Sequence, residues 1–121
     1  MKAKTGPAAL SLRRSICPLA CALDVWGDKW TLVIVRDLFF GKKHYGALLE
    51  SGEGITTSIL SDRLKRLERS GLIERRPYQE RPLRYEYHLT SAGRDLFPVI
   101  REVVRWSNKH IPGTRRARYF V

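Results

Sequence analysis

The sequence predicts a small, mainly helical α+β domain, and three observations support this class. Leu60, Leu64 and Leu67 fall at positions i, i+4 and i+7, which is the spacing of one face of an α-helix. Residues 84–89 alternate between polar and apolar side chains, as a half-buried β-strand does. The chain has 121 residues, which is enough for one domain around one hydrophobic core.

Charge and composition divide the chain into three parts. We expect a flexible basic arm over residues 1–14, a folded domain over 15–111 and a basic tail over 112–121. The arm holds four cations and the tail three, and neither holds an acid. The whole chain carries 23 Lys and Arg against 12 Asp and Glu, for a net charge of +11. Such a balance indicates a polyanionic partner, either nucleic acid or an anionic membrane surface.

Membrane insertion and secretion are not expected. No stretch approaches the roughly 20 consecutive apolar residues of a membrane span, and the basic N-terminus lacks the apolar region of a secretory signal. We therefore expect a cytoplasmic protein that does not associate with membranes.

The first predicted helix covers residues 18–26 and places a cysteine at its start. Pro18 suits the first helical position, so Cys17 would be the N-cap, where the free amides and the helix dipole favour a thiolate. Cys21 follows four residues later, which is not the spacing of a CxxC motif. On an intact helix the two Cβ atoms would lie about 5–6 Å apart, too far for an undistorted disulfide, which needs about 3.5–4.5 Å.

The next three predicted helices form the centre of the domain. Asp28 would cap a second helix over residues 29–40, which is apolar on nearly every side and should lie in the core. A short helix follows within residues 44–52. The helix over 55–71, with Thr56 as its N-cap and a glycine after its last turn, completes a helix-turn-helix pattern.

The polar face of the 55–71 helix has the character of a DNA-recognition surface. Small hydroxylated side chains lie at its N-terminal end and cations at its C-terminal end, so the first turns can approach base edges while the longer side chains reach phosphates. An ordinary solvated helix face is the alternative. The candidate recognition residues are Thr57, Ser58, Ser61, Arg63, Lys65 and Arg66, of which Arg63 and Arg66 lie nearer the flanks and should meet the DNA backbone.

A basic hairpin follows this helix directly. We expect strands over residues 72–78 and 84–89, joined by a polar connection over 79–83. A helix-turn-helix followed by a basic hairpin is a winged helix-turn-helix, in which the hairpin, or wing, contacts the phosphate backbone or the minor groove. The candidate wing residues are Arg75, Arg76, Arg81 and Arg84.

The last predicted helix runs from residue 91 to 110, capped by Thr90 and kinked or loosened by Pro98. Its wide apolar stripe comes after the core already has its helices, which favours a subunit interface with the first helix. The alternative is that this helix folds back onto its own domain. The candidate interface residues are Leu19, Leu23, Leu96, Ile100, Val103 and Trp106.

From Cys17 to Trp106 the chain resembles the HxlR-type winged-helix transcriptional regulators of bacteria, relatives of the MarR group. The resemblance rests on the combination of Cys-Pro, Gly-Asp-Lys-Trp, Leu-Ser-Asp-Arg-Leu, Gly-Leu-Ile-Glu-Arg and Tyr-x-Leu-Thr-x-x-Gly. It implies homodimers joined through the first and last helices that bind inverted-repeat operators. It also implies that Cys17 occupies the position at which some members sense electrophiles or oxidants. Cys21 is a departure from the family pattern, either a resolving thiol between subunits or a small core residue.

The sequence therefore predicts a homodimeric, sequence-specific DNA-binding regulator, with redox sensing as one interpretation and an inert buried cysteine as the other. It shows no Ser-His-Asp pattern, phosphate-binding glycine loop or paired carboxylates, so we expect neither an enzyme nor a cofactor. Three scattered histidines and two cysteines show no recurring ligand spacing, so we expect no metal site. A non-specific basic RNA- or DNA-binding protein and a protein-interaction module remain as alternatives.

Overall fold

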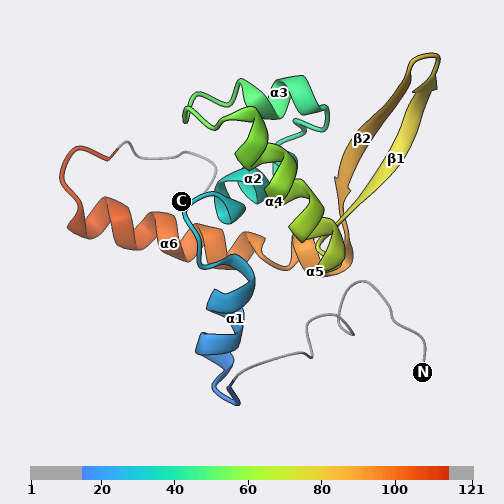
Figure 1. Ribbon diagram of the computed structural model, residues 1–121. Coiled ribbons are helices and arrows are strands. Elements are labelled where there is room, and N and C mark those ends of the chain that lie inside the picture. The colour runs from blue at the N-terminus through green and yellow to red at the C-terminus, as the bar shows by residue number, and fades with distance from the viewer. Residues whose placement is uncertain (1–14, 115–121) are drawn as a thin grey trace.

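The computed structural model describes residues 15–114 (Figure 1). The predicted basic arm over 1–14 and residues 115–121 of the predicted tail lie outside the described residues. The described part consists of six helices and one two-stranded antiparallel sheet, which confirms the predicted mainly helical α+β class. The elements are α1 (Pro18–Trp26), α2 (Thr31–Phe39), α3 (Tyr45–Leu49), α4 (Thr57–Arg69), β1 (Ile73–Glu80), β2 (Leu83–Leu89), α5 (Ser91–Arg94) and α6 (Phe97–His110).

The core forms around α2, which lies at the centre of the molecule (Figure 1). Val35 of α2 is fully buried, and the stripe of Leu60, Leu64 and Leu67 on α4 is buried beside it, as the helical spacing predicted. The start and end of α4 also follow the prediction. Thr56 accepts a hydrogen bond from the amide of Ile59 at the N-cap, and the chain leaves the helix through Gly71 with a φ of 75°, a conformation that costs glycine little.

Asp28 joins the central helix to α4. Its carboxylate accepts hydrogen bonds from the amides of Trp30 and Thr31 at 3.0 and 3.2 Å, and from the Thr31 hydroxyl, so it satisfies free amides at the start of α2. The helix itself begins at Thr31, two residues later than predicted, and its N-cap position is Trp30 and not Asp28. The same carboxylate accepts from Nε of Arg63 at 2.8 Å. Burial alone would raise the pKa of Asp28, but the hydrogen bonds from Thr31, Arg63 and Trp30 together with the Arg63 charge lower it from 3.8 to about 2.

The hairpin is longer than predicted. Residues 79–83 were expected to form a connection, but Gln79 pairs with Arg84 and Glu80 with Leu83, so the turn contains only residues 81–82. The prediction was wrong because it treated polar side chains as a sign of a loop. The hairpin projects away from the helices (Figure 1), and a strand exposed to water on both faces pairs through its backbone whatever its side chains are.

The last helix is two helices, not one. α5 ends at Arg94 and α6 begins at Phe97, with Pro98 in its first turn. Pro98 has no amide hydrogen to donate to the carbonyl of Arg94, and its ring would collide with that carbonyl in a continuous helix. The chain therefore breaks before the proline, and the predicted kink is a full interruption.

The apolar stripe of this segment divides between two environments. Leu96 and Ile100 are 8% and 5% exposed within the protomer's own core, which corrects their prediction as interface residues. The rings of Phe39 and Phe97 stack at 4.4 Å, fixing the start of α6 against α2. Farther along α6, Trp106 is 59% exposed. The expectation that this helix folds back onto its own domain therefore holds for its first turns, whereas its later turns extend beyond the domain and leave Val103 and Trp106 exposed.

We predict that Asp28→Asn lowers the free energy of unfolding at pH 7 by about 1–2 kcal/mol, because it removes the charge that pairs with Arg63 in a partly exposed site. Since the pKa of Asp28 is lower in the folded protein, its contribution is complete above about pH 4 and disappears as the pH falls through about 2. Urea unfolding of both proteins between pH 2 and 7 measures this. Glu102→Gln, in a surface ion pair on α6, is the control. Equal losses in the two variants at every pH would contradict the role of Asp28.

Candidate nucleic-acid interface

The exposed face of α4 begins at a tight turn after α3. Gly52 and Gly54 both have positive φ, at 95° and 78°, which allows the chain to reverse between the two helices. Thr57 and Ser58 follow in the first turn of α4, and both are exposed. The structure therefore presents short hydroxylated side chains at the positively polarised end of a helix, on a face that other elements leave open.

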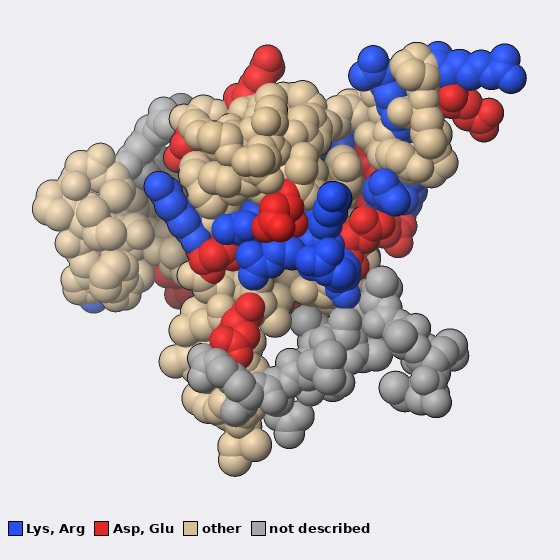
Figure 2. All heavy atoms as spheres, in the orientation of Figure 1, with Lys and Arg blue, Asp and Glu red and all other residues tan. Residues whose placement is uncertain are grey.

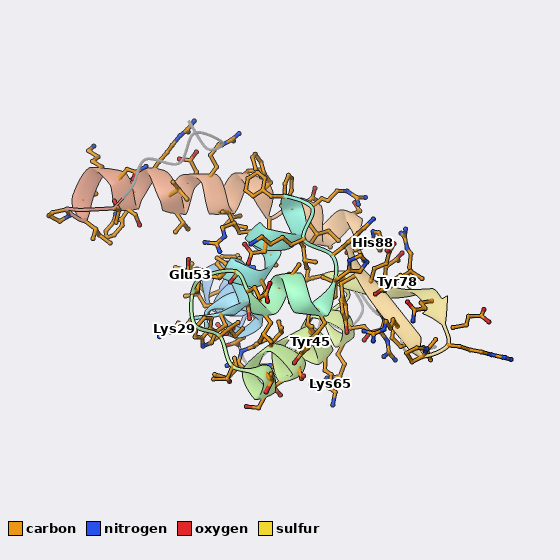
Figure 3. The ribbon with its side chains drawn as sticks, turned by 90° about the horizontal axis from the view of Figure 1, so that it is seen from above. Lys29, Tyr45, Glu53, Lys65, Tyr78 and His88 are labelled. Carbon is orange, nitrogen blue, oxygen red and sulfur yellow. The ribbon has the colours of Figure 1, made fainter. Side chains whose placement is uncertain are left out.

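Tyr45 of α3 fixes the position of this helix start. Its hydroxyl lies 3.1 Å from the carbonyl oxygen of Thr57 and 3.1 Å from Oγ of Ser61. Figure 3 shows Tyr45 between α3 and α4, on the same side of the molecule as Lys65. The sequence alone did not reveal this contact, although a buried or half-buried tyrosine usually has a partner for its hydroxyl. Ser61, a predicted recognition residue, is half-buried and engaged by this bond.

The cations of α4 divide into one that is held and others that are exposed. Arg63 is 20% exposed, with Nε on Asp28 and one terminal nitrogen 2.5 Å from Asp62. Hydrogen bonds and the charge of Asp28 raise its pKa above the ordinary value. Lys65 is exposed and projects from the helix (Figure 3), and Arg66 is 45% exposed with only a 3.8 Å contact to Asp62. Lys65 and Arg66 are therefore available to a ligand, while Arg63 supports the fold.

The wing arginines divide in the same way. Arg75 pairs with Glu68 of α4 at 3.4 Å and lies 4.4 Å from the ring centre of Tyr85. Arg76 donates to Glu74 at 2.7 Å. Arg81 and Arg84, by contrast, are exposed. No ion pair joins either of them to a carboxylate of residues 15–114.

Lys and Arg side chains extend from the tip of the hairpin, and others lie over α4 with acidic side chains among them (Figure 2). The unpaired cations of the wing therefore lie at its tip, and the paired ones at its base.

The base of the wing is attached to the segment before α3. The amide of Tyr87 donates to the carbonyl of Lys43 at 2.8 Å, and His44 forms a bridge with Glu86. Glu86 accepts a 2.7 Å hydrogen bond from His88 and lies 3.8 Å from Nζ of Lys43. The bond to His88, and then the charges of Lys43 and His88, lower the pKa of Glu86. These contacts set the direction of the hairpin relative to the helix-turn-helix.

The two cysteines lie apart from this surface, at the start of α1. Cys17 is exposed at the N-cap and makes no side-chain capping bond. Sγ of Cys21 is half-buried and donates to the carbonyl of Ser15 at 3.0 Å. Neither thiol is in a disulfide. Among the described residues no group of three His, Cys, Asp or Glu side chains is arranged to bind a metal ion, and no described helix is long and apolar enough to cross a bilayer.

Comparison with known proteins identifies the family. The family model described as HxlR-like helix-turn-helix matches residues 25–115. The chain is 44% identical over 91 residues to an uncharacterised HTH-type transcriptional regulator of Mycobacterium tuberculosis; the match covers 75% of this chain and 57% of the relative. The chain thus spans little more than half the length of that relative.

Two solved structures have the same arrangement of helices and wing. The reduced form of the transcriptional regulator YodB from B. subtilis is 28% identical, with a TM-score of 0.68, and the match covers 84% of this chain and 100% of that one. The redox regulator HypR in its oxidised form is 32% identical, with a TM-score of 0.71, and the match covers 78% and 97%. Since the family model, the sequence relatives and the winged helix-turn-helix fold agree, this chain belongs to the HxlR-like helix-turn-helix family of transcriptional regulators.

Proposed function

We propose that the protein is a homodimeric, sequence-specific DNA-binding regulator that binds an inverted-repeat operator. One observation carries the proposal: the first turns of α4 are exposed beside a hairpin whose unpaired arginines lie at its tip. A helix of this kind fits the major groove while the wing contacts the neighbouring backbone or minor groove. The family relationship supports the same function.

Within this surface the contacts of each side chain suggest its role. Thr57, Ser58 and Lys65 are exposed on α4 and would approach base edges, while Arg66 would contact phosphates. Arg81 and Arg84 would contact the backbone from the wing. Two residues expected at the interface receive a different role in this proposal: Ser61 holds α4 against α3, and Arg63 holds it against Asp28.

The competing proposal is a basic protein that binds RNA or DNA without sequence preference. The net charge of +11 favours both proposals equally. The turn that exposes Thr57 and Ser58 favours specific duplex binding, because short hydroxylated side chains on a helix contribute little to purely electrostatic attraction.

We predict that selection from a random duplex library in moderate salt enriches an inverted repeat, with half-sites about one helical turn apart or a multiple of it. Lys65→Gln should lose or change the enriched motif. Arg81→Gln with Arg84→Gln should weaken binding to all duplexes alike and reduce the salt dependence by about two counterions per protomer, or about four per dimer. Arg105→Gln, on α6, is the charge-matched control for Lys65→Gln, and Arg105→Gln with Lys109→Gln is the control for the wing pair. Binding without any enriched motif, or equal competition by structured RNA, would instead support the non-specific protein.

Dimerisation is proposed through the exposed apolar residues of α1 and of the second half of α6. Leu19 and Leu23 are 65% and 46% exposed on α1, and no residue of α1 is buried. Val103 and Trp106 are 48% and 59% exposed on α6. A helix without a buried residue gains little from its own domain, and burying these side chains against a second copy would remove a large apolar area from water.

We predict that Trp106→Glu converts the dimer to a monomer at micromolar concentration, since a buried unpaired carboxylate opposes association. Sedimentation velocity measures the change. Leu83→Glu introduces the same charge at the wing, where Leu83 is 56% exposed, and should leave the oligomeric state unchanged. A dimer that survives the first change, or is lost with the second, would exclude this interface.

A redox input through Cys17 is the proposal suggested by the similarity to the redox regulator HypR. The exposed thiol at the N-cap of α1 lies next to the proposed dimer helices, so its oxidation would alter the packing of the two subunits. Two exposed or half-exposed thiols four residues apart also allow disulfides between subunits, with Cys21 as the resolving thiol.

We predict that mild treatment with hydrogen peroxide lowers the operator affinity of the wild-type protein at least tenfold, and that dithiothreitol restores it. Cys17→Ser should make the affinity insensitive to peroxide. Cys21→Ser separates the two roles of the second thiol, because a resolving cysteine is needed for a disulfide-linked dimer on a non-reducing gel and a core residue is not. A Cys17→Ser protein that still responds to peroxide would exclude Cys17 as the sensor.

A further inference from the structure

An open pocket of about 480 Å³ lies between the end of α2, residues 41–43, the base of the hairpin and α5. Its volume falls within the range of roughly 300–1,000 Å³ typical of small-molecule sites. No residue of α4 lines this pocket, and neither the proposed DNA contacts nor the proposed dimer interface involves it.

The charged lining of this pocket has one sign. Lys43 comes from the segment before α3, Arg76 from the hairpin and Arg94 from α5, and no acidic residue lines the pocket. Cations from three separate elements meet here because the hairpin folds back against residues 43 and 44. Outside the pocket, Glu74 pairs with Arg76, and Glu86 lies 3.8 Å from Lys43.

Arg94 is the cation without an acidic partner. One of its terminal nitrogens donates to the carbonyl of Leu89 at 2.8 Å, which fixes the direction of the guanidinium group. No described carboxylate lies within ion-pair distance of it, so its remaining N–H groups are available to an anion.

The apolar lining consists of Leu38, Phe39 and Leu89. Leu38 is 8% exposed, and Phe39 is held by its stack on Phe97. The pocket thus combines a rigid apolar surface with a cationic rim, which is the complement of a molecule with one anionic group and one apolar part.

We infer that this pocket binds a small organic anion, with its carboxylate or phosphate on Arg94 and Lys43 and its apolar part on Phe39 and Leu89. The site would be an effector site in addition to the DNA surface. Because Arg76 and His88 of the hairpin also line the pocket, an occupant would contact the base of the wing; only this effect on DNA rests on the proposed function.

The test is titration calorimetry of the full chain, without DNA, using 2-naphthoate and 2-naphthyl phosphate, which share the apolar part and differ in the anionic group. At least one should bind at least tenfold more tightly than neutral 2-naphthamide, which has no charge for the rim. At least one should also bind at least tenfold more tightly than inorganic phosphate, which has no apolar part. Failure of either comparison would overturn the proposal.

Lys43→Gln with Arg94→Gln should weaken binding at least tenfold, while Arg105→Gln with Lys109→Gln, which removes two charges from α6, should not. An unchanged affinity in the first variant would overturn the site. Should that variant fail to fold, amide chemical shifts of the wild-type protein decide the matter. The shifts should change at Gly41, Lys43 and Leu89, and changes confined to α1 or α4 would place the ligand elsewhere. Because no DNA is present, these results are independent of whether the protein binds an operator.

Discussion

The carboxylate of Asp28 is the contact on which the arrangement of the helices depends. It satisfies the free amides at the start of α2 and also accepts from Arg63 in the middle of α4. One side chain therefore completes the central helix and fixes the helix proposed to read DNA against it. The hydroxyl of Tyr45 adds a second attachment nearer the start of α4. Together they hold α4 at two points, so that its open face is presented in one orientation, as a recognition helix requires.

A second junction connects the end of α4 to the hairpin and to α5. The Thr90 hydroxyl donates to the carbonyl of Gly71 at 2.6 Å and accepts from the amide of Gly93 at 3.2 Å, while its own amide donates to the carbonyl of Leu72 at 3.0 Å. A Cβ atom at position 93 would collide with the Leu72 carbonyl oxygen, so only glycine allows this close approach. The junction gives a physical reason for the Thr-x-x-Gly part of the sequence pattern, because Thr90 and Gly93 both contact the backbone at the end of α4.

The charge of the protein is used in two ways. Arginines that face carboxylates, such as Arg63 and Arg75, hold elements together, whereas Arg81, Arg84 and Lys65 carry the charge that remains for a partner. The wing takes part in both the proposed DNA contact at its tip and the proposed anion pocket at its base. The direction of the hairpin is fixed by contacts near Lys43 and Glu86. These contacts therefore place both the tip of the wing and the pocket at its base, in a protein with a small core.

The sequence by itself determined most of the helices, the caps of α4, its core stripe and the order of helix-turn-helix and hairpin, because these follow from local periodicity and capping chemistry. Residues over 79–83 were predicted wrongly because strand pairing is decided by the opposite strand. Leu96 and Ile100 were predicted at a subunit interface but lie in the core, because periodicity shows that a helix face is apolar and not which partner covers it. Only the tertiary structure decided which cations form ion pairs with carboxylates and that Arg94 and Lys43 line the same pocket. These contacts join residues that are far apart in the chain.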